Sequence, residues 1–266
     1  MATKKSADLK ASTGKASTAV AVRPNTNIVS IRDQLAKQAA AMTERTAAPS
    51  GVKIKVAPGG KFTLPSGQVV QGTLEAVIVD FRTTHAFYAG KYDKNNIQPP
   101  VCAAVGSNPK AMIPFKASPD AQCGDCQACP MNQFGSDGDG KACKNSRRLA
   151  LLPPNEAGDG VDGEAELWTL EVSPTALKGF DGYVRNLAST FALPPVAFLT
   201  TIGMDESVDY VKLTFSNPRP LSADDMAAAF ARQGEATPLL EAEPDMTPRT
   251  APAKQASTRK VANARR

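Results

Sequence analysis

Apolar and polar residues alternate along much of the middle of the chain, with the period of β-strands that bury one face. The runs are short and are separated by turn residues, and PSGQ at 65–68 has the composition of a hairpin turn. Strands are therefore predicted over five stretches of the first half: 52–56, 61–64, 73–82, 85–92 and 101–105.

The same alternation returns after a cysteine-rich stretch. It predicts strands over 147–153 and 165–174, with a polar loop between them. A closing hairpin is predicted over 195–204 and 207–216, because the turn-forming residues MDES separate two runs rich in aromatic and β-branched residues.

Apolar residues recur at helical spacing in a few places only. A helix is predicted over 175–190, and another over 222–232, where Ser222 is followed three residues later by Asp225, as in a capping box. A short helix is also predicted after Ser30. The helix over 175–190 is defined by Leu177, Phe180, Val184 and Leu187. The helix after Ser30 is defined by Ile31, Leu35, Ala39 and Met42.

Strands outnumber helices, and no strand–helix–strand alternation indicates a parallel sheet. We therefore expect a mainly β fold, an OB-like antiparallel barrel of five to seven strands with a few short helices. The predicted barrel covers 51–234 and contains an inserted cysteine knuckle at 101–148. Residues 1–50 and 235–266 are polar and rich in Ala, Thr and Pro, and are expected to be disordered basic arms.

Positive charge is concentrated in these arms. The chain carries 31 Lys and Arg against 26 Asp and Glu, a net charge of +5. Residues 1–27 contribute +4 and residues 247–266 contribute +6, so the remainder is acidic at −5. No apolar run is long enough to span a bilayer and no secretory signal is visible, so we expect a cytoplasmic protein without a membrane partner.

The cysteines are grouped in a way that is typical of a metal site. Zinc takes four soft ligands in a tetrahedron, and a C-x-x-C turn presents two thiolates to one ion. We expect a structural zinc bound by Cys102, Cys126, Cys129 and Cys143, with Cys123 as a reserve ligand. Cys129-Pro130 opens a new turn and Cys102 ends a strand, but the choice among the central cysteines stays open.

Three roles for the cysteines compete with zinc binding. Buried free thiols are common, but they do not account for a strict three-residue spacing in a polar loop. An iron–sulfur cluster would use a similar C-x-x-C-x-x-C run, but its fourth cysteine comes too late in this chain. A redox C-x-x-C normally follows a strand in a βαβ unit, which the pattern lacks.

Aromatic and basic residues gather on both sides of the cysteines. Single-stranded nucleic acid is bound by aromatic rings that stack on bases and by cations that contact phosphates. The net negative charge of residues 28–246, which lie between the two basic segments, counts against a uniformly positive face. The cations would therefore have to be concentrated locally. The expected nucleic-acid contacts are Arg82, Tyr88, Lys91, Tyr92, Lys94, Lys141, Lys144, Arg147 and Arg148.

Nothing in the sequence indicates an enzyme. His85 is the single histidine, and no GxSxG or P-loop pattern is present. His85 is not followed by the glutamate of the zinc deaminase signature. It could replace one cysteine as a zinc ligand, but we expect an ordinary strand histidine. Four cysteine ligands would leave the ion no open position for catalysis.

The stretch from Gly72 to Pro153 resembles a family of bacteriophage single-stranded DNA-binding proteins with a four-cysteine zinc knuckle. The motifs that carry the resemblance are FYAGKYD at 87–93, PPVC at 99–102, C-x-x-C-P-x-N-Q-F-G-S at 126–136 and GKACK at 140–144. The resemblance implies Cys126, Cys129 and Cys143 as zinc ligands and supports Cys102, which leaves Cys123 in reserve.

The resemblance also implies a role in phage DNA replication or recombination. Single-stranded DNA and phage replication proteins would then be the partners, in the cytoplasm of an infected bacterial cell. The chain departs from zinc-containing proteins of this kind in its basic C-terminal end, where an acidic tail usually recruits partners. The alternative function is a zinc-ribbon-like protein-interaction module or a transcription or replication accessory factor. In a third hypothesis, a packaging or virion protein binds DNA through its basic arms alone.

Overall fold

A computed structural model describes residues 52–90, 93, 97–244 and 246, together with residues 31, 34, 35 and 38. By its contacts the chain divides into Met1–Ala48 and Pro49–Arg266, and the β-strands that the structure describes lie in the second unit. Residues 31, 34, 35 and 38 are helical and exposed. The rest of the helix predicted after Ser30 lies outside the described residues.

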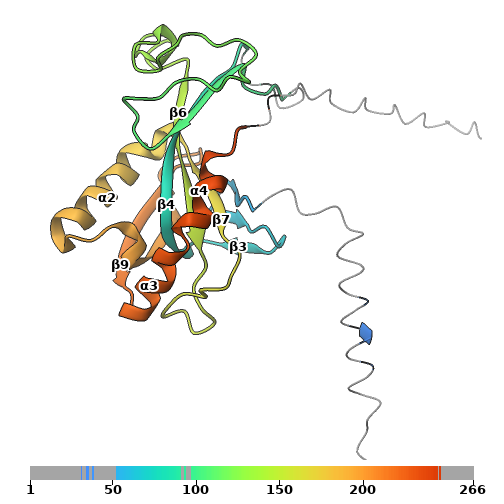
Figure 1. The fold of residues 1–266 in the computed structure, drawn as a ribbon, viewed down its shortest axis with the longest axis vertical. Helices are drawn as coiled ribbons and strands as arrows, with labels where there is room; N and C mark the ends of the chain where they lie inside the picture. The colour runs from blue at the N-terminus through green and yellow to red at the C-terminus, as the bar shows by residue number, and fades with distance from the viewer. Residues whose placement is uncertain are drawn as a thin grey trace, which may run out of the picture. The chain divides into compact units, whose positions relative to one another are not determined.

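A six-stranded antiparallel sheet forms the centre of the second unit (Figure 1). Its strand order is β7-β6-β4-β8-β9, and β5 pairs with the far end of β4. The strands are β4 (Leu74–Phe87), β5 (Cys102–Gly106), β6 (Lys144–Leu152), β7 (Trp168–Val172), β8 (Phe198–Met204) and β9 (Leu213–Pro220).

The central strand β4 is longer than its sequence pattern predicts. Residues 73–82 and 85–92 were expected to form two strands, but Leu74–Phe87 is one continuous strand. Thr83 and Thr84, which interrupt the apolar pattern, are both buried. The Thr84 hydroxyl lies 2.7 Å from the Ser146 hydroxyl and donates to Glu171 at 2.9 Å. A polar residue stays inside the strand here because its hydroxyl is hydrogen-bonded across the sheet.

Helices cover the sheet on both faces at one end of β4 (Figure 1). Helix α2 (Leu177–Phe191) buries Phe180, Tyr183 and Leu187 in a cluster that includes Ala76 and Ile78 of β4. On the other face, Val77 and Val79 join a cluster with helices α3 (Ala223–Ala231) and α4 (Gln233–Glu241). Burial on both faces explains the uninterrupted apolar run AVIV at 76–79.

A second, three-stranded sheet packs its Phe62 into the α2 side of the core. Leu64 and Gly67 close the turn predicted at 65–68, where the Leu64 amide donates to Gln68 and the Gly67 amide to Leu64. Gly67 has a positive φ of 86°, which glycine adopts without strain. The strands are β1 (Lys55–Ala57), β2 (Lys61–Thr63) and β3 (Val69–Gln71).

The structure corrects the predicted C-terminal boundary of the core. The chain after residue 234 was expected to be part of a disordered arm, but α4 runs to Glu241 and buries Ala236 and Leu240 completely. The pattern QGEATPLLE hides this helix because Gly234 and Pro238 are poor helix formers. Helix α3 begins as predicted, with the Ser222 hydroxyl accepting from the Asp225 amide at 3.1 Å.

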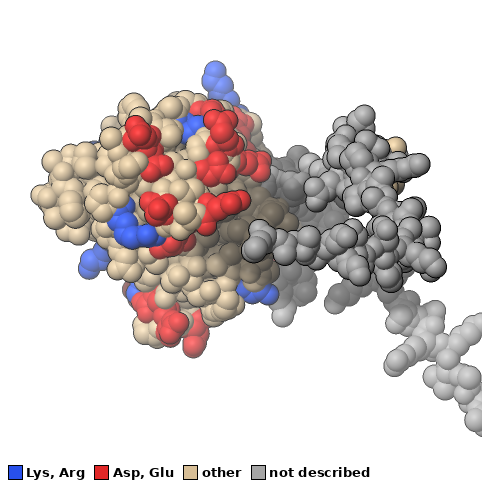
Figure 2. Space-filling view, turned by 90° about the horizontal axis from the view of Figure 1, so that it is seen from below, with Lys and Arg blue, Asp and Glu red and all other residues tan. Residues whose placement is uncertain are grey.

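Acidic side chains gather at the end of the sheet that carries α3 (Figure 2). This end also holds the β6–β7 connection, since the Val161 amide donates to Asp225 of α3 at 3.3 Å. The cysteines lie at the other end of β4, which is 14 residues long and so spans about 45 Å. The exposed acidic residues of the α3 end include Glu156, Asp159, Asp162, Glu164 and Asp224.

The prediction of a mainly β, antiparallel fold with few helices is confirmed. In the strand order, β7 and β9 stand at opposite ends, so closure into an OB-like barrel stays a prediction. Among the residues that the structure describes, no helix has the length and apolar character needed to cross a bilayer.

Candidate metal centre and adjoining groove

Two of the cysteines are brought together by the strands at the far end of β4. Phe87 pairs directly with Cys102 of β5, and Ala86 pairs with Lys144 of β6. Cys143 precedes Lys144, so it stands beside Phe87 on the other side of β4. Residues that face each other across antiparallel strands share one face of the sheet. Cys102 and Cys143 therefore flank the end of β4 although 40 residues separate them in the chain.

The remaining three cysteines lie in the β5–β6 connection, residues 107–143, which folds back over this end of the sheet. The Cys126 amide donates to Met112 at 3.0 Å, and the Cys143 amide donates to Met131 at 2.8 Å. Asn132 is buried at the end of the short 3₁₀ helix η1 (Pro130–Asn132), and its side-chain amide donates to the Cys126 carbonyl at 2.7 Å. These hydrogen bonds connect the C-x-x-C turn to Met112 and to η1.

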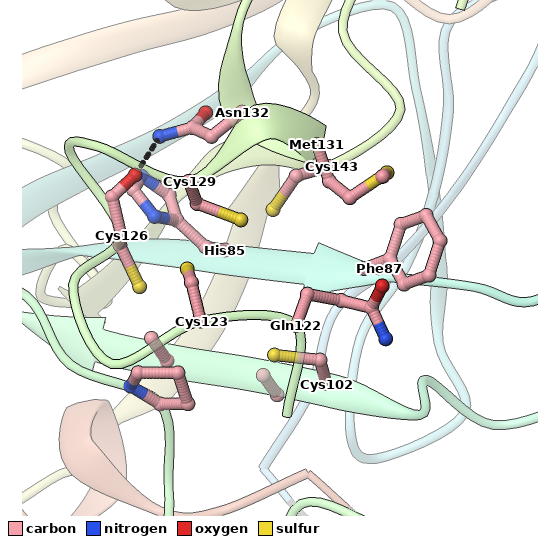
Figure 3. A pocket seen from close by; sticks show the side chains of 13 residues that line it. His85, Phe87, Cys102, Gln122, Cys123, Cys126, Cys129, Met131, Asn132 and Cys143 are labelled. Atoms are coloured by element: carbon pink, nitrogen blue, oxygen red, sulfur yellow. Dashed lines mark hydrogen bonds between the residues drawn. The ribbon is translucent and has the colours of Figure 1, made fainter. Parts of the chain in front are cut away.

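All five cysteines line one small cavity of about 10 Å³, the room that one bound water or ion would take (Figure 3). Cys102, Cys126, Cys129 and Cys143 are buried, whereas Cys123 is partly exposed. None of the five is in a disulfide. The Cys123 thiol donates to the Asp125 carbonyl at 3.0 Å, so it already has a hydrogen-bond partner outside the cavity.

The cavity disfavours charge on the thiols. Burial raises the pKa of Cys126 and of Cys143 to about 12, and neighbouring cysteines add to both effects. A hydrogen bond from the Ala86 backbone opposes this rise in the pKa of Cys143. Without an ion these thiols are protonated at neutral pH. Metal binding requires deprotonated sulfur, so an ion would have to displace those protons.

His85 is a member of the cavity wall that sequence reasoning set aside. It is two residues before Phe87 on the same face of β4, and only 4% of its surface is exposed. Burial, with the positive charges of Lys141 and Arg147, lowers the pKa of His85 to about 4, so the ring is neutral at pH 7. Its Nδ1 has no hydrogen-bond partner among the described residues. Buried polar atoms are rarely left unpaired, so we expect this nitrogen to bind a further group in the cavity.

In the described part of the chain, no group of three or more His, Cys, Asp or Glu side chains has the arrangement needed to hold a metal ion. The thiols share a cavity, but they would have to draw closer to coordinate a metal. The donor set suits zinc, which prefers thiolate sulfur and imidazole nitrogen. The four buried cysteines are the ligands predicted from sequence, and they could hold such an ion.

The three predicted arginine contacts, Arg82, Arg147 and Arg148, are all engaged in ion pairs. The Arg82 guanidinium lies 2.6 Å from Asp80 and 3.0 Å from Glu241. Arg147 lies 3.2 Å from Asp181 of α2. These side chains are 14% exposed, so they tie the helices to the sheet and have little surface left for phosphates.

Arg148 is held in the same way. Its guanidinium donates to the carbonyls of Leu240 and Ala242 at 3.0 Å and 2.7 Å, and it lies 3.7 Å from Glu171. The two carbonyls belong to the last turn of α4, where a cation stabilises the helix end. Arg148 is therefore part of the contact that fixes α4 against β6.

The other predicted contacts fall close to the cysteines. Tyr88 is 42% exposed, and the Lys144 side chain is 48% exposed although it pairs with Asp137 at 2.8 Å. Lys141 is half-buried, and its ammonium lies 3.4 Å from the Asn132 side-chain oxygen. The remaining predicted contacts, which are Lys91, Tyr92 and Lys94, lie outside the described residues.

A groove of about 1150 Å³ runs beside the cysteine cavity. Phe87 and Tyr88 at the end of β4 form one part of its wall, and Met131 and Lys144 form another. Ile97, which is 56% exposed, and Lys53 complete the apolar and basic lining. Sequence reasoning missed both residues, because neither belongs to a periodic pattern near the cysteines. The groove brings aromatic, apolar and basic side chains to one concave surface.

No family model, no curated protein and no solved structure matched this chain.

Proposed function

We propose that this protein binds single-stranded DNA in the groove beside the cysteine cavity. The observation that carries the proposal is the lining of the groove, to which Phe87 and Tyr88 contribute aromatic rings and Lys53 and Lys144 contribute cations. Unpaired bases stack on aromatic faces while cations contact the phosphates, and stacking contributes about 1–3 kcal/mol per base. A duplex hides its base faces, so a groove of this kind favours single strands.

We further propose a structural zinc ion in the adjoining cavity, held by Cys102, Cys126, Cys129 and Cys143. Four sulfur ligands would close the coordination shell, so the ion would brace the β5–β6 connection and carry out no chemistry. The brace matters for binding because Met131, Ser136 and Lys144, which line the groove, are in or next to that connection. On this proposal the protein is a binding protein and not an enzyme.

The charge distribution supports binding at the cysteine end. Exposed carboxylates gather at the α3 end of the sheet (Figure 2), where they would repel phosphates. The groove is lined by two carboxylates, Asp93 and Asp137, and by two lysines, Lys53 and Lys144, so its lining carries no net charge. The basic segments 1–27 and 247–266 can add phosphate contacts that do not depend on sequence.

We also propose that the sheet closes into an OB-like barrel. An OB-like barrel would place its DNA-binding strands around β4, with the zinc knuckle inserted between β5 and β6. The proposed setting is phage DNA replication or recombination in the cytoplasm of an infected bacterium, with phage replication proteins as further partners.

Fluorescence titration of the purified protein with oligo-dT, at two salt concentrations, tests the DNA proposal. We expect binding that is tighter than micromolar at low salt and that weakens as salt rises, because bound phosphates displace counterions. Duplex DNA of the same length serves as the control and should bind more weakly. Affinity weaker than micromolar at low salt, without salt dependence, would contradict the proposal and leave the protein-interaction module as the alternative.

A further inference from the structure

Phe134 lies in the β5–β6 connection and is the most exposed large apolar side chain among the described residues, at 80%. An aromatic ring in that position costs free energy, since its apolar surface stays in water. It is not explained by the core, by the cysteine cavity or by the lining of the groove.

Hydrogen bonds on both sides hold the backbone of Phe134 in place. The Gln133 side chain donates to the carbonyls of Gln127 and Cys129 at 2.8 Å and 3.2 Å. The Gly135 amide donates to Gly140 at 2.9 Å, which closes a small loop after the ring. Gly135 has a φ of 91°, so this turn depends on glycine. A ring presented on a braced loop loses little conformational freedom when it binds.

A cation accompanies the ring. The Lys141 ammonium lies 5.0 Å from the centroid of Phe134, within the range of a cation–π contact. The same loop reaches the groove, because Met131 and Ser136, on either side of Phe134 in the chain, both line it. An aromatic face and a positive charge therefore stand next to each other on the knuckle, at the side that the groove adjoins.

We propose that Phe134 and Lys141 form a second stacking site, in which an unpaired nucleobase lies on the ring and its phosphate contacts the ammonium. This inference rests on the proposed function and extends it from the groove to the tip of the knuckle. It makes the cysteine-rich connection a direct contact surface for single-stranded DNA.

The test uses the full chain as purified and two probes: oligo-dT and an abasic oligonucleotide of the same length. Phe134→Ala should weaken oligo-dT binding by about 5-fold to 150-fold, the range of one stacked base. Binding to the abasic strand should not change. Phe134→Trp should keep the affinity and Phe134→Leu should lose it, because stacking needs a π face and not merely apolar bulk. Lys141→Gln should reduce the slope of log affinity against log salt by about 0.7.

Phe230→Ala is the matched control, since Phe230 is also exposed, at 61%, but belongs to α3 at the acidic end. It should leave both probes unaffected. Equal oligo-dT affinity of Phe134→Ala, Phe134→Leu and the parent protein would overturn the stacking site while leaving the groove proposal intact. Failure of the parent protein to bind oligo-dT at all would overturn both.

Discussion

At the scale of single residues, Cys123 differs from the other cysteines of the cavity. It is partly exposed and its thiol donates to the Asp125 carbonyl, whereas the other four thiols are buried. A tetrahedral zinc ion needs four ligands, so one of five thiols is surplus. We expect Cys123, the most exposed of the five, to be that residue.

We therefore expect Cys126→Ser to abolish zinc binding and Cys123→Ser to retain one zinc per chain. Metal analysis of the purified variants measures this directly. Because zinc binding contributes folding free energy, removal of the ion by a chelator should also lower the melting temperature of the parent protein. A Cys123→Ser variant without metal would place Cys123 in the ligand set.

His85 should support the zinc site without coordinating the ion. We expect its ring nitrogen to donate to a zinc-bound thiolate, which would give the unpaired Nδ1 a partner. His85→Phe should then keep the stoichiometry but weaken zinc affinity by about 10-fold to 100-fold, as is typical for groups that hydrogen-bond to ligands. His85→Asn, which keeps a donor near Nδ1, should lose less.

X-ray absorption spectroscopy separates the two roles of His85. We expect only sulfur neighbours, at about 2.3 Å from the zinc. A nitrogen neighbour at about 2.0–2.1 Å that disappears in His85→Phe would show that the imidazole is itself a ligand.

Asp205 gives a pH dependence that is independent of the metal. Hydrogen bonds from Lys212, at 2.8 Å, and from Ser207 hold the pKa of Asp205 well below its ordinary value of 3.8. A carboxylate with a lowered pKa in the folded state stabilises the fold above the ordinary pKa, and this contribution is lost as the pH falls below it. Asp205→Asn should therefore flatten the acid side of the stability profile, measured by urea unfolding between pH 5 and pH 2. Equal slopes for the two proteins would contradict the assignment.

At the scale of secondary structure, helix α4 is part of the core and not of the C-terminal arm. Gln233 donates to the Val79 carbonyl of β4 at 3.1 Å, and Arg148 of β6 donates to the last turn of the helix. Leu240 is fully buried between these strands and α3. The helix thus seals one face of the sheet.

Leu240→Ala should lower the free energy of unfolding by about 2–5 kcal/mol, because it leaves a cavity in a packed core. Pro238→Ala, at an exposed position of the same helix, should be neutral or slightly stabilising, since alanine is the better helix former. Denaturant unfolding of the two variants makes the comparison. A small effect of Leu240→Ala would mean that α4 is only loosely docked.

At the scale of the whole molecule, charge is separated into basic terminal segments, an acidic end of the sheet and a mixed groove at the cysteine end. We expect bases to stack on the folded core, and the terminal segments to add only salt-sensitive phosphate contacts. A packaging or virion protein that binds through its arms would show the opposite division.

Deleting residues 1–27 and 247–266 should therefore reduce the salt dependence of oligo-dT binding but preserve the preference for oligo-dT over an abasic strand. Titrations of the parent and the shortened protein with both probes measure this. Complete loss of DNA binding in the shortened protein would assign the binding to the arms.

The sequence by itself determined the β-rich class, most strands, the helix start at Ser222 and the grouping of the cysteines at one site. These follow from local signals: alternation, helical spacing, a cap and the C-x-x-C spacing. It could not show that one strand continues from the first predicted stretch, 73–82, into the second, 85–92. The hydrogen-bond partners that keep Thr84 inside that strand are Ser146 of β6 and Glu171 of β7. Helix α4 was equally hidden, since its stability comes from burying Leu240 and not from its own helix propensity.

Tertiary structure alone decided how the candidate site is assembled. Strand register sets Cys102, Cys143 and His85 around the end of β4, and the folded connection adds the remaining thiols. It also pairs the guanidinium groups of Arg82, Arg147 and Arg148 with groups distant in the chain. Local spacing can indicate which side chains are able to bind metal or phosphate. Whether such a side chain is free to do so depends on neighbours that only the fold supplies.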